Sequence, residues 1–446
     1  MIENNELKRT LTTRNLVIFG MMTMSPLAPF QVYGAVAQAS FGMVTLAYFI
    51  GALLMFFTAL SYARFSREFP YAGSVYTYVS RGLNPHVGFI AGWVLLSDYI
   101  LAPALLCLFS SMWLTGLFPG INMTLVALTL IVIVTLINIL GVEINAKVNT
   151  LLFVVQLIAL ALFLGFIVKF VFIDGQGFGG FSLVPLFQAE HVDLTFIATA
   201  TSMLLLGFMG FDGISTLAEE TKEPRKMVGR ATILALVSSA SLFFIQTYLA
   251  SLAHKNYMDL DPDMALFDIA KTVGGHWFYV AMIIINVLAV GVAVTLNIQS
   301  SVSRVLYSMG RDDVLFGGKF LSKIHPRFRT PINALLFSMV VSSLVILLVD
   351  LNTVIMLINF GAVTAFSGLN IAVIAYFFIK KKERSGKNIL FHLVFPLIGF
   401  LVCAYVWSGF DTTTKIVGLS WIGIGIILGA IKTKGYTKNP LEIKDL

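Results

Sequence analysis

The chain has 446 residues, of which 58% are hydrophobic and only 12% are charged, and its mean hydropathy is +0.88. Soluble domains carry about 25% charged residues, so this composition excludes a soluble enzyme or binding module and indicates a protein that crosses the membrane many times. The formal net charge of +7 is the remaining feature to explain, since it is also compatible with nucleic-acid binding.

Apolar runs of about 20 residues predict membrane-spanning helices. The chain contains twelve, at about residues 15–38, 43–66, 85–117, 122–141, 148–172, 195–218, 227–253, 277–309, 331–350, 352–379, 390–409 and 413–432. The third and eighth exceed one bilayer width, so we expect them to be tilted or to extend into the cytoplasm. The sequence therefore predicts an all-α integral membrane protein, with residues 1–446 forming one transmembrane domain.

The basic residues are concentrated in alternate loops. With both termini inside, 26 of the 30 lysines and arginines fall on the cytoplasmic side. This bias predicts an even number of spans and cytoplasmic N- and C-termini in a multi-pass protein of the cytoplasmic membrane. It also assigns the net positive charge to the anionic inner leaflet of the lipid bilayer, so we expect no nucleic-acid partner.

The first apolar segment contains an interruption, Thr23–Gly34, with Pro26 and Pro29 three residues apart. Two prolines remove two backbone donors and prevent continuous helical bonding. A break in the helix is the prediction, and a simple kink is the alternative.

The sixth segment contains a second interruption, Leu204–Gly213, which holds three glycines and Asp212. Irregular backbone at membrane depth persists only against protein or a polar cavity, so we interpret this stretch as a broken helix beside a cavity. A glycine-rich helix-packing face with a hydrogen-bonded aspartate is the alternative.

The two interruptions are five helices apart, so their helices run in opposite directions. Interrupted helices at matching places in two oppositely oriented halves indicate a substrate site near the bilayer midplane. Free N–H groups at the half-helices would suit a carboxylate. The candidate substrate-binding residues are Ser25, Pro26, Leu27, Ala28, Pro29, Phe30, Gln31, Asp98, Gly207, Phe208, Met209, Gly210, Phe211 and Asp212.

Two acidic residues stand out because they lie inside apolar segments. Asp212 is predicted to bind a substrate amine or to carry a coupling proton, and capping of the second half-helix is the alternative. Asp98 is a functional candidate in the third segment, unless it lies near the cytoplasmic third and is simply hydrated.

Polar residues in the eighth segment, Thr295, Asn297 and Ser300, are candidates for ion coupling, because hydroxyl and carbonyl oxygens suit a hard cation. Polar contact between helices is the alternative. Glu219 and Glu220 lie beside basic residues at the end of the sixth segment and are interpreted as structural or gating groups. Cys107 and Cys403 lie in apolar runs, and we expect no disulfide, metal site or cofactor.

Five motifs occur in order along the chain. They are Glu-Phe-Pro-x-Ala-Gly-Ser-x-Tyr-x-Tyr at 68–78, Asn-Pro-His-Val-Gly-Phe at 84–89, Gly-Phe-Asp at 210–212, Glu-Glu-Thr at 219–221 and Ser-Arg-Val-Leu-Tyr at 303–307. Together they resemble the amino acid–polyamine–organocation permeases, and the match looks closest to the putrescine-importer branch.

This resemblance implies a five-plus-five inverted repeat of the leucine-transporter type, with helices 1 and 6 broken. The first repeat would span about 15–172 and the second about 195–379, followed by accessory helices at about 390–432. The resemblance also implies secondary transport by alternating access, often driven by protons.

Two positions depart from the family pattern. Many proton-coupled relatives have a lysine in the fifth helix where this chain has Gln156, and an amide cannot release a proton at physiological pH. Gln156 is nevertheless kept as an ion-coupling candidate beside Asp212. Putrescine importers tend to have an acidic residue where this chain has Gln31, which removes one natural partner for a diamine.

The resulting functional prediction is a secondary active importer of a small amine-bearing solute, either an amino acid or a polyamine such as putrescine, coupled to H⁺ or Na⁺. An exchanger of amines and amino acids and, in another class, a passive channel are the alternatives. No nucleotide-binding loop of the ATP-driven type and no hydrolase motif is found, so an enzyme is not expected.

Overall fold

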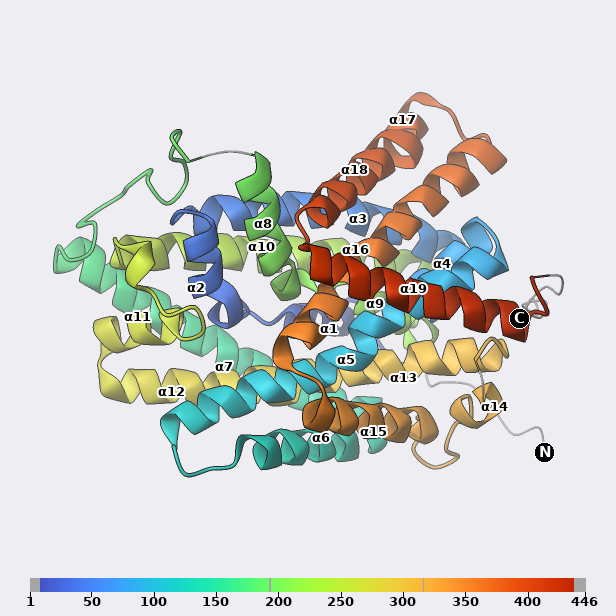
Figure 1. Ribbon diagram of the computed structural model, residues 1–446, viewed down its shortest axis with the longest axis horizontal. Helices are drawn as coiled ribbons and strands as arrows, with labels where there is room; N and C mark the ends of the chain where they lie inside the picture. The colour runs from blue at the N-terminus through green and yellow to red at the C-terminus, as the bar shows by residue number, and fades with distance from the viewer. Residues whose placement is uncertain (1–8, 192–193, 316, 437–446) are drawn as a thin grey trace.

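The computed structural model describes residues 9–191, 194–315 and 317–436. Apart from an isolated bridge between Leu11 and Thr221, this part of the chain forms only helices, turns and loops (Figure 1). The helices are α1 (Thr13–Met24), α2 (Pro29–Ala39), α3 (Val44–Glu68), α4 (Ser74–Gly82), α5 (Pro85–Leu117), α6 (Met123–Ile139), α7 (Val142–Val168), α8 (Leu194–Phe208), α9 (Gly213–Thr216), α10 (Pro224–Ala253), α11 (Ala265–Gly274), α12 (His276–Asn286), α13 (Thr295–Arg311), α14 (Gly318–Leu321), α15 (Ile332–Leu348), α16 (Leu351–Val373), α17 (Gly386–Ile389), α18 (Phe395–Ser408) and α19 (Thr412–Lys432).

The membrane-spanning prediction is confirmed. Eight helices of the described chain are long and apolar enough to cross a bilayer, and the pair α1 and α2, bent by 50°, makes a ninth span. The shorter apolar helices α6 and α15 and the broken pair α8 and α9 coincide with the other three predicted segments. Short π-helical stretches extend α7 to Ile173 and join α12 to α13, so the latter pair forms one continuous span, His276–Arg311.

Residues with specific backbone roles define where the helices begin. Asn84 precedes α5, and its side chain accepts hydrogen bonds from the backbone N–H groups of His86 and Val87. Pro85 occupies the first position of that helix, where a missing N–H has no cost. Asp411 likewise caps α19 by accepting from the backbone of Thr414. These are standard helix-initiating signals.

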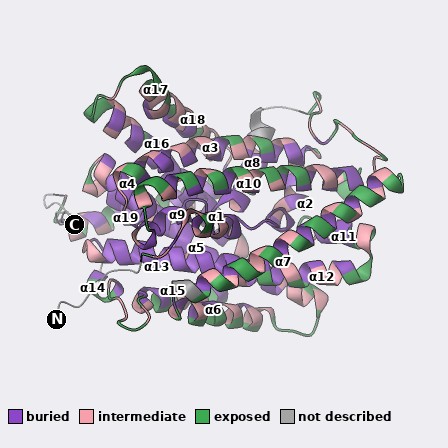
Figure 2. Cartoon of the chain, turned by 180° about the vertical axis from the view of Figure 1, so that it is seen from behind, coloured by how far each residue is buried: buried purple, intermediate pink, exposed green. Residues whose placement is uncertain are grey.

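The burial colouring shows buried residues toward the interior of the bundle and exposed residues on its outer helices (Figure 2). Many of the exposed residues are large and apolar, such as Leu125, Leu151 and Ile416. Close helix contacts depend on small residues: a β-carbon added at Gly229 of α10 would lie 2.8 Å from the backbone of Ala63 in α3. Small residues at such crossings allow helices to pack closely where the lipid supplies no hydrophobic driving force.

The two ends of the bundle differ in character. One end, here called the terminal end, carries α4, α14 and both ends of the described chain (Figure 1). The other, here called the distal end, carries α11 and the segment 174–191. Of the three helices that the hydropathy pattern does not predict, α4 and α14 lie at the terminal end and α11 at the distal end.

Candidate functional site

The predicted break in the first span is present. Helix α1 ends at Met24 and α2 begins at Pro29, and the backbone of Ser25 takes a left-handed φ of 58°. Pro29 occupies the first turn of α2, so it starts the second half-helix and does not lie within the break. The predicted residues Ser25 to Gln31 are all buried, and they occupy this turn and the beginning of α2.

The N–H groups around this first break are less available than the sequence suggests. Leu27 donates its N–H to the hydroxyl of Ser25 at 3.2 Å, and Ala28 donates to the carbonyl of Ser25 at 3.0 Å. Phe30 and Gln31 also donate to carbonyls of the turn, each at 3.0 Å. In this arrangement, the beginning of α2 offers fewer free donors than an uncapped helix end.

The second break is also present. Helix α8 ends at Phe208 and α9 begins at Gly213, with Gly210 at a φ of 107°. Within the described residues, the N–H groups of Gly210, Phe211 and Asp212 donate to no backbone carbonyl. The N–H groups of Gly210 and Asp212 instead hydrogen-bond to the carboxylate of Asp212, so this break, like the first, satisfies part of its own backbone.

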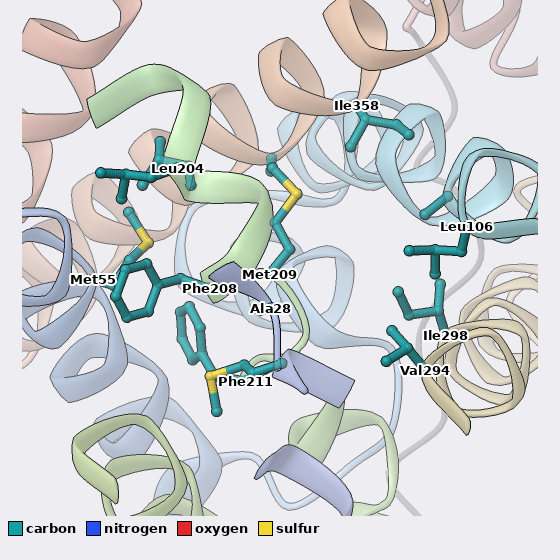
Figure 3. Close-up of a cluster of buried hydrophobic side chains, with 14 of the residues drawn as sticks. Ala28, Met55, Leu106, Leu204, Phe208, Met209, Phe211, Val294, Ile298 and Ile358 are labelled. Atoms are coloured by element: carbon teal, nitrogen blue, oxygen red, sulfur yellow. The ribbon is translucent and has the colours of Figure 1, made fainter. Parts of the chain in front are cut away.

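The two breaks lie against each other. A β-carbon added at Gly210 would come within 2.9 Å of the β-carbon of Thr23, and one at Gly207 within 3.4 Å of the β-carbon of Ala28. Figure 3 shows Ala28 beside Met209 and Phe208, with Leu106, Val294, Ile298 and Ile358 on the opposite side. The structure thus brings the two predicted stretches together beside an apolar wall from α5, α13, α16 and the stretch joining α12 to α13.

Asp212 is the central polar group of this region, with only 1% of its surface exposed. Its Oδ2 accepts a hydrogen bond from the Tyr99 hydroxyl of α5 and a longer one, 3.4 Å, from the Tyr62 hydroxyl of α3. Asp212 occupies the position before α9, but its side chain accepts no capping bond. The capping interpretation is therefore wrong, because the carboxylate faces the two tyrosines.

The contact between Tyr62 and Asp212 was not predicted from the sequence. The Tyr62 hydroxyl also pairs with the Ser74 hydroxyl at 3.1 Å, which links α3, α4 and Asp212. Nothing in the sequence of the 25-residue apolar helix α3 distinguishes Tyr62 from a tyrosine that only packs against its neighbours.

Asp98 is the second buried carboxylate, with 3% of its surface exposed. It lies near the middle of α5 and immediately precedes Tyr99. It has no hydrogen-bond or ion-pair partner among the residues described. Helix α16 approaches closely here, because a β-carbon at Gly361 would lie 3.2 Å from the backbone nitrogen of Asp98.

Gln156 contacts the first break directly. It is 1% exposed on α7, its Oε1 accepts a hydrogen bond from the Ser25 hydroxyl at 2.9 Å, and its Nε2 donates to the sulfur of Met22 at 3.4 Å. The residue that replaces the family's lysine thus still joins the fifth span to the break, through neutral hydrogen bonds.

The polar residues of the eighth span each have a protein donor or acceptor already. Thr295 donates its hydroxyl to the carbonyl of Val290 at 2.9 Å, and Asn297 donates to the carbonyl of Phe19 at 3.4 Å. The carbonyl of Ser300 accepts from Arg304 at 2.9 Å, and its hydroxyl accepts from the same guanidinium. The role of these three residues in ion coupling stays a prediction.

A buried amide network was not predicted. Asn297 accepts a hydrogen bond from Asn149 at 2.7 Å, Asn149 donates to Asn145, and Asn145 donates to Asn138 at 2.9 Å. Asn138 in turn donates to Gln299 at 3.0 Å. The network joins α6, α7 and α13 to α1, and no sequence spacing indicates pairs that lie up to 161 residues apart.

Two ion pairs at the terminal end join α13 to the end of the sixth span. Arg304 and Glu220 lie 2.5 Å apart, with 7% and 4% of their side chains exposed, and Arg311 lies 3.1 Å from Glu219. The backbone N–H of Ala72 also donates to Glu219 at 3.2 Å. Both glutamates thus hold α13 to the end of the sixth span, in keeping with a structural or gating role.

Comparison with known proteins identifies the family of this fold. A family model described as amino acid permease matches residues 20–430. The chain belongs to the amino acid permease family.

Similar relatives differ in the solutes that their names describe. The low-affinity putrescine importer PlaP of Escherichia coli is 34% identical over 98% of this chain and 96% of its own length. The branched-chain amino acid permease BcaP of Bacillus subtilis is 25% identical over 97% and 94%, respectively. The methylthioribose transporter of Bacillus subtilis is also 25% identical, over 96% and 94%. This chain is thus an amino acid permease family member, a multi-pass membrane protein and a transporter of amino acids or amines.

Proposed function

We propose that this permease is a secondary active importer of a small amine-bearing solute, either an amino acid or a polyamine such as putrescine, working by alternating access. The observation that carries the proposal is the pair of buried carboxylates, Asp98 and Asp212, close to the two helix breaks. A carboxylate buried at membrane depth requires a cationic partner or a proton. A protonated amine supplies that partner.

The arrangement supports binding of the two ends of such a solute by different groups. Asp212 would pair with an amine, and Asp98 would pair with a second amine or would tune selectivity together with Gln31. Two carboxylates are enough for a diamine even though Gln31 is neutral, and the putrescine importer among the relatives favours this reading. For an amino acid, the N–H group of Phe211, which donates to no backbone carbonyl of the described residues, would bind the substrate carboxylate.

Of the two coupling ions, the proton is the one that the side chains near the breaks favour. Asp98 and Asp212 are carboxyl groups that can bind a proton, whereas Gln156 cannot. A sodium site is less well supported, because Arg304 already donates to both oxygens of Ser300 and Asn149 donates to the side-chain oxygen of Asn297.

We further propose that the terminal end faces the cytoplasm of a bacterial-type cell, with both termini inside. Most lysines and arginines would then face the anionic leaflet. The pairs Glu220–Arg304 and Glu219–Arg311 would form an inner gate. The division into repeats of about 15–172 and 195–379 with accessory helices at about 390–432 belongs to the same proposal.

Uptake into vesicles that contain the purified protein tests this function. We expect putrescine or an amino acid to accumulate when a proton gradient is imposed, and Asp212→Asn to abolish accumulation while the protein remains folded. Counterflow without any ion gradient, combined with no accumulation under a gradient, would identify an exchanger. Unchanged uptake and pH dependence in Asp212→Asn would remove this residue from the mechanism.

A thermal-shift series on the purified protein identifies the solute class independently of coupling. A ligand that binds only the folded state raises the unfolding temperature. We expect amines or amino acids to produce a shift that neutral sugars do not, and we expect Asp98→Asn and Asp212→Asn to reduce it.

A further inference from the structure

Four buried polar side chains behind the first helix break lack hydrogen-bond partners among the described residues. They are Thr45 and Tyr48 of α3, Thr201 of α8 and Gln246 of α10. Their exposed fractions are 0%, 1%, 0% and 0%, respectively. Buried polar groups are nearly always hydrogen-bonded, because leaving one unpaired costs free energy comparable to a lost hydrogen bond.

Three of these side chains, Thr45, Tyr48 and Gln246, belong to one region of the bundle. The ring of Tyr48 packs against Phe208 at 6.0 Å and against Phe243 at 5.8 Å. Gln246 lies three residues after Phe243 and hence one turn further along the same face of α10. Thr45 lies three residues before Tyr48, on the same face of α3.

Thr201 is a fourth unpartnered group, on α8. Leu204 faces Gly51 of α3, where an added β-carbon would also lie 3.4 Å from the ring of Phe208. Thr201 lies one turn before Leu204, on the same side of α8, and therefore also faces α3. Leu204 and Phe208 mark this side of α8 in Figure 3.

The region extends to the break itself. The Tyr48 hydroxyl lies 3.9 Å from the position that a β-carbon of Gly207 would occupy, and the same position lies 3.4 Å from Ala28. The unpartnered groups are therefore at the back of the two breaks, on the side away from α5.

A cavity lies at the distal end of the same two helices, α3 and α10. Its volume is about 150 Å³, and its lining includes Tyr33 of α2, Val44 of α3 and both Ser251 and His254 at the end of α10. Val44 directly precedes Thr45, and the Nε2 of His254 also has no partner within the described chain. One water needs roughly 10–15 Å³, so the cavity has room for several.

We propose that ordered water occupies this second polar space, from the distal cavity to the back of the breaks, and bonds to Thr45, Tyr48, Thr201 and Gln246. Buried water typically makes two to four hydrogen bonds to groups of this kind. Gln246 alone offers two donors and an acceptor, so one side chain can hold more than one water. Neither Asp98 nor Asp212 lines the distal cavity.

The hydrated space has a mechanical role, which depends on the proposed transport function. Helix α2 contacts α3, α8 and α10, which carry the unpartnered groups, and alternating access requires such half-helices to tilt. A helix face that contacts water exchanges hydrogen bonds as it moves and does not have to separate closely packed side chains. Water behind α2 would therefore ease its displacement.

Radiolytic hydroxyl-radical labelling with mass spectrometry tests the water directly in the full-length protein in lipid nanodiscs. Radicals formed from bound water modify adjacent side chains even where bulk solvent has no access. We expect Tyr48, although 1% exposed, to be labelled at a rate nearer that of Phe181, which is 83% exposed, than that of Phe65, which is 0% exposed in an aromatic cluster. Labelling of Tyr48 as slow as that of Phe65 overturns the proposal.

A variant that removes the polar groups extends the test. We expect Gln246→Leu with Thr201→Val to suppress Tyr48 labelling, to raise the unfolding temperature by a few degrees and to slow uptake. If the double variant does not fold, Thr201→Val alone serves, with a smaller decrease in labelling. Unchanged labelling in a folded variant overturns the assignment of these side chains.

The labelling result is independent of whether the protein transports an amine. If the variant loses Tyr48 labelling but takes up solute as fast as the active wild type, the mechanical role is overturned and the water site is supported. A small organic molecule retained in native mass spectra of the wild type, and absent from the variant, overturns water as the occupant.

Discussion

The carboxylate of Asp212 accepts hydrogen bonds from hydroxyl groups on two other helices, so its orientation depends on residues distant from it in the sequence. Tyr99 of α5 donates to Oδ2, and Tyr62 of α3 lies at 3.4 Å from the same oxygen. Hydrogen bonds to a charged group contribute about 1.5–3 kcal/mol. The tyrosines of α3 and α5 therefore orient the carboxylate as much as its own position before α9 does.

Replacing Tyr99 tests that dependence. We expect Tyr99→Phe to lower the apparent affinity for the transported amine by about tenfold, because Asp212 loses its nearer donor. Concentration-dependent uptake into vesicles measures the change. Tyr248→Phe is the matched control, since the Tyr248 hydroxyl donates to the carbonyl of Ser182 far from the breaks, and an equal effect of both variants would contradict the prediction.

The buried pair Glu220–Arg304 makes a second prediction at this scale. Removing one partner leaves an uncompensated buried charge, which costs about 3–5 kcal/mol. We expect Glu220→Gln to lower the unfolding temperature markedly and Glu220→Gln with Arg304→Met to recover much of the loss. Glu223→Gln is the control, because its pair with Lys226 is exposed and surface pairs contribute little.

At the scale of the helix, the two breaks and their convergence on one site were predictable, whereas the residues that touch between them were not. Proline and glycine locate the breaks in the sequence because they remove donors or permit left-handed backbone. Hydropathy found the spans because the bilayer requires long apolar helices. The short helices α4, α11 and α14 were missed because windows of membrane length average over them, and Tyr62 and the asparagine network were missed because their partners are distant in sequence.

Gly210 offers a test of the contact between the breaks. Its φ of 107° and the closeness of Thr23 both oppose a side chain. We expect Gly210→Ala to destabilise the protein by about 1–3 kcal/mol and to reduce uptake. Gly116→Ala in α5 is the control, because an added β-carbon there meets nothing within 4 Å, and a thermal-unfolding series that ranks the two variants equally would argue against the contact.

At the scale of the whole molecule, the uneven distribution of basic residues predicts the orientation in the membrane. Both native cysteines, Cys107 and Cys403, are buried, so we expect them to react little with a thiol reagent and to interfere little with labelling of an introduced cysteine. We expect a membrane-impermeant maleimide to label Ala189→Cys in intact cells and to label Lys323→Cys only after permeabilisation. Both positions are exposed, at the distal and terminal ends, respectively. The reverse result would invert the proposed topology.

The residues just before α1 are bonded to the end of the sixth span. Thr10 and Leu11 donate their N–H groups to the carbonyl of Glu220 at 2.9 and 3.0 Å, and Lys222 donates to the carbonyl of Leu11 at 3.1 Å. Displacing residues 10 and 11 would remove both donors from the Glu220 carbonyl and loosen the seating of Glu220 against Arg304. The backbone ahead of one broken span is thereby tethered to the end of the other, so that neither can shift alone.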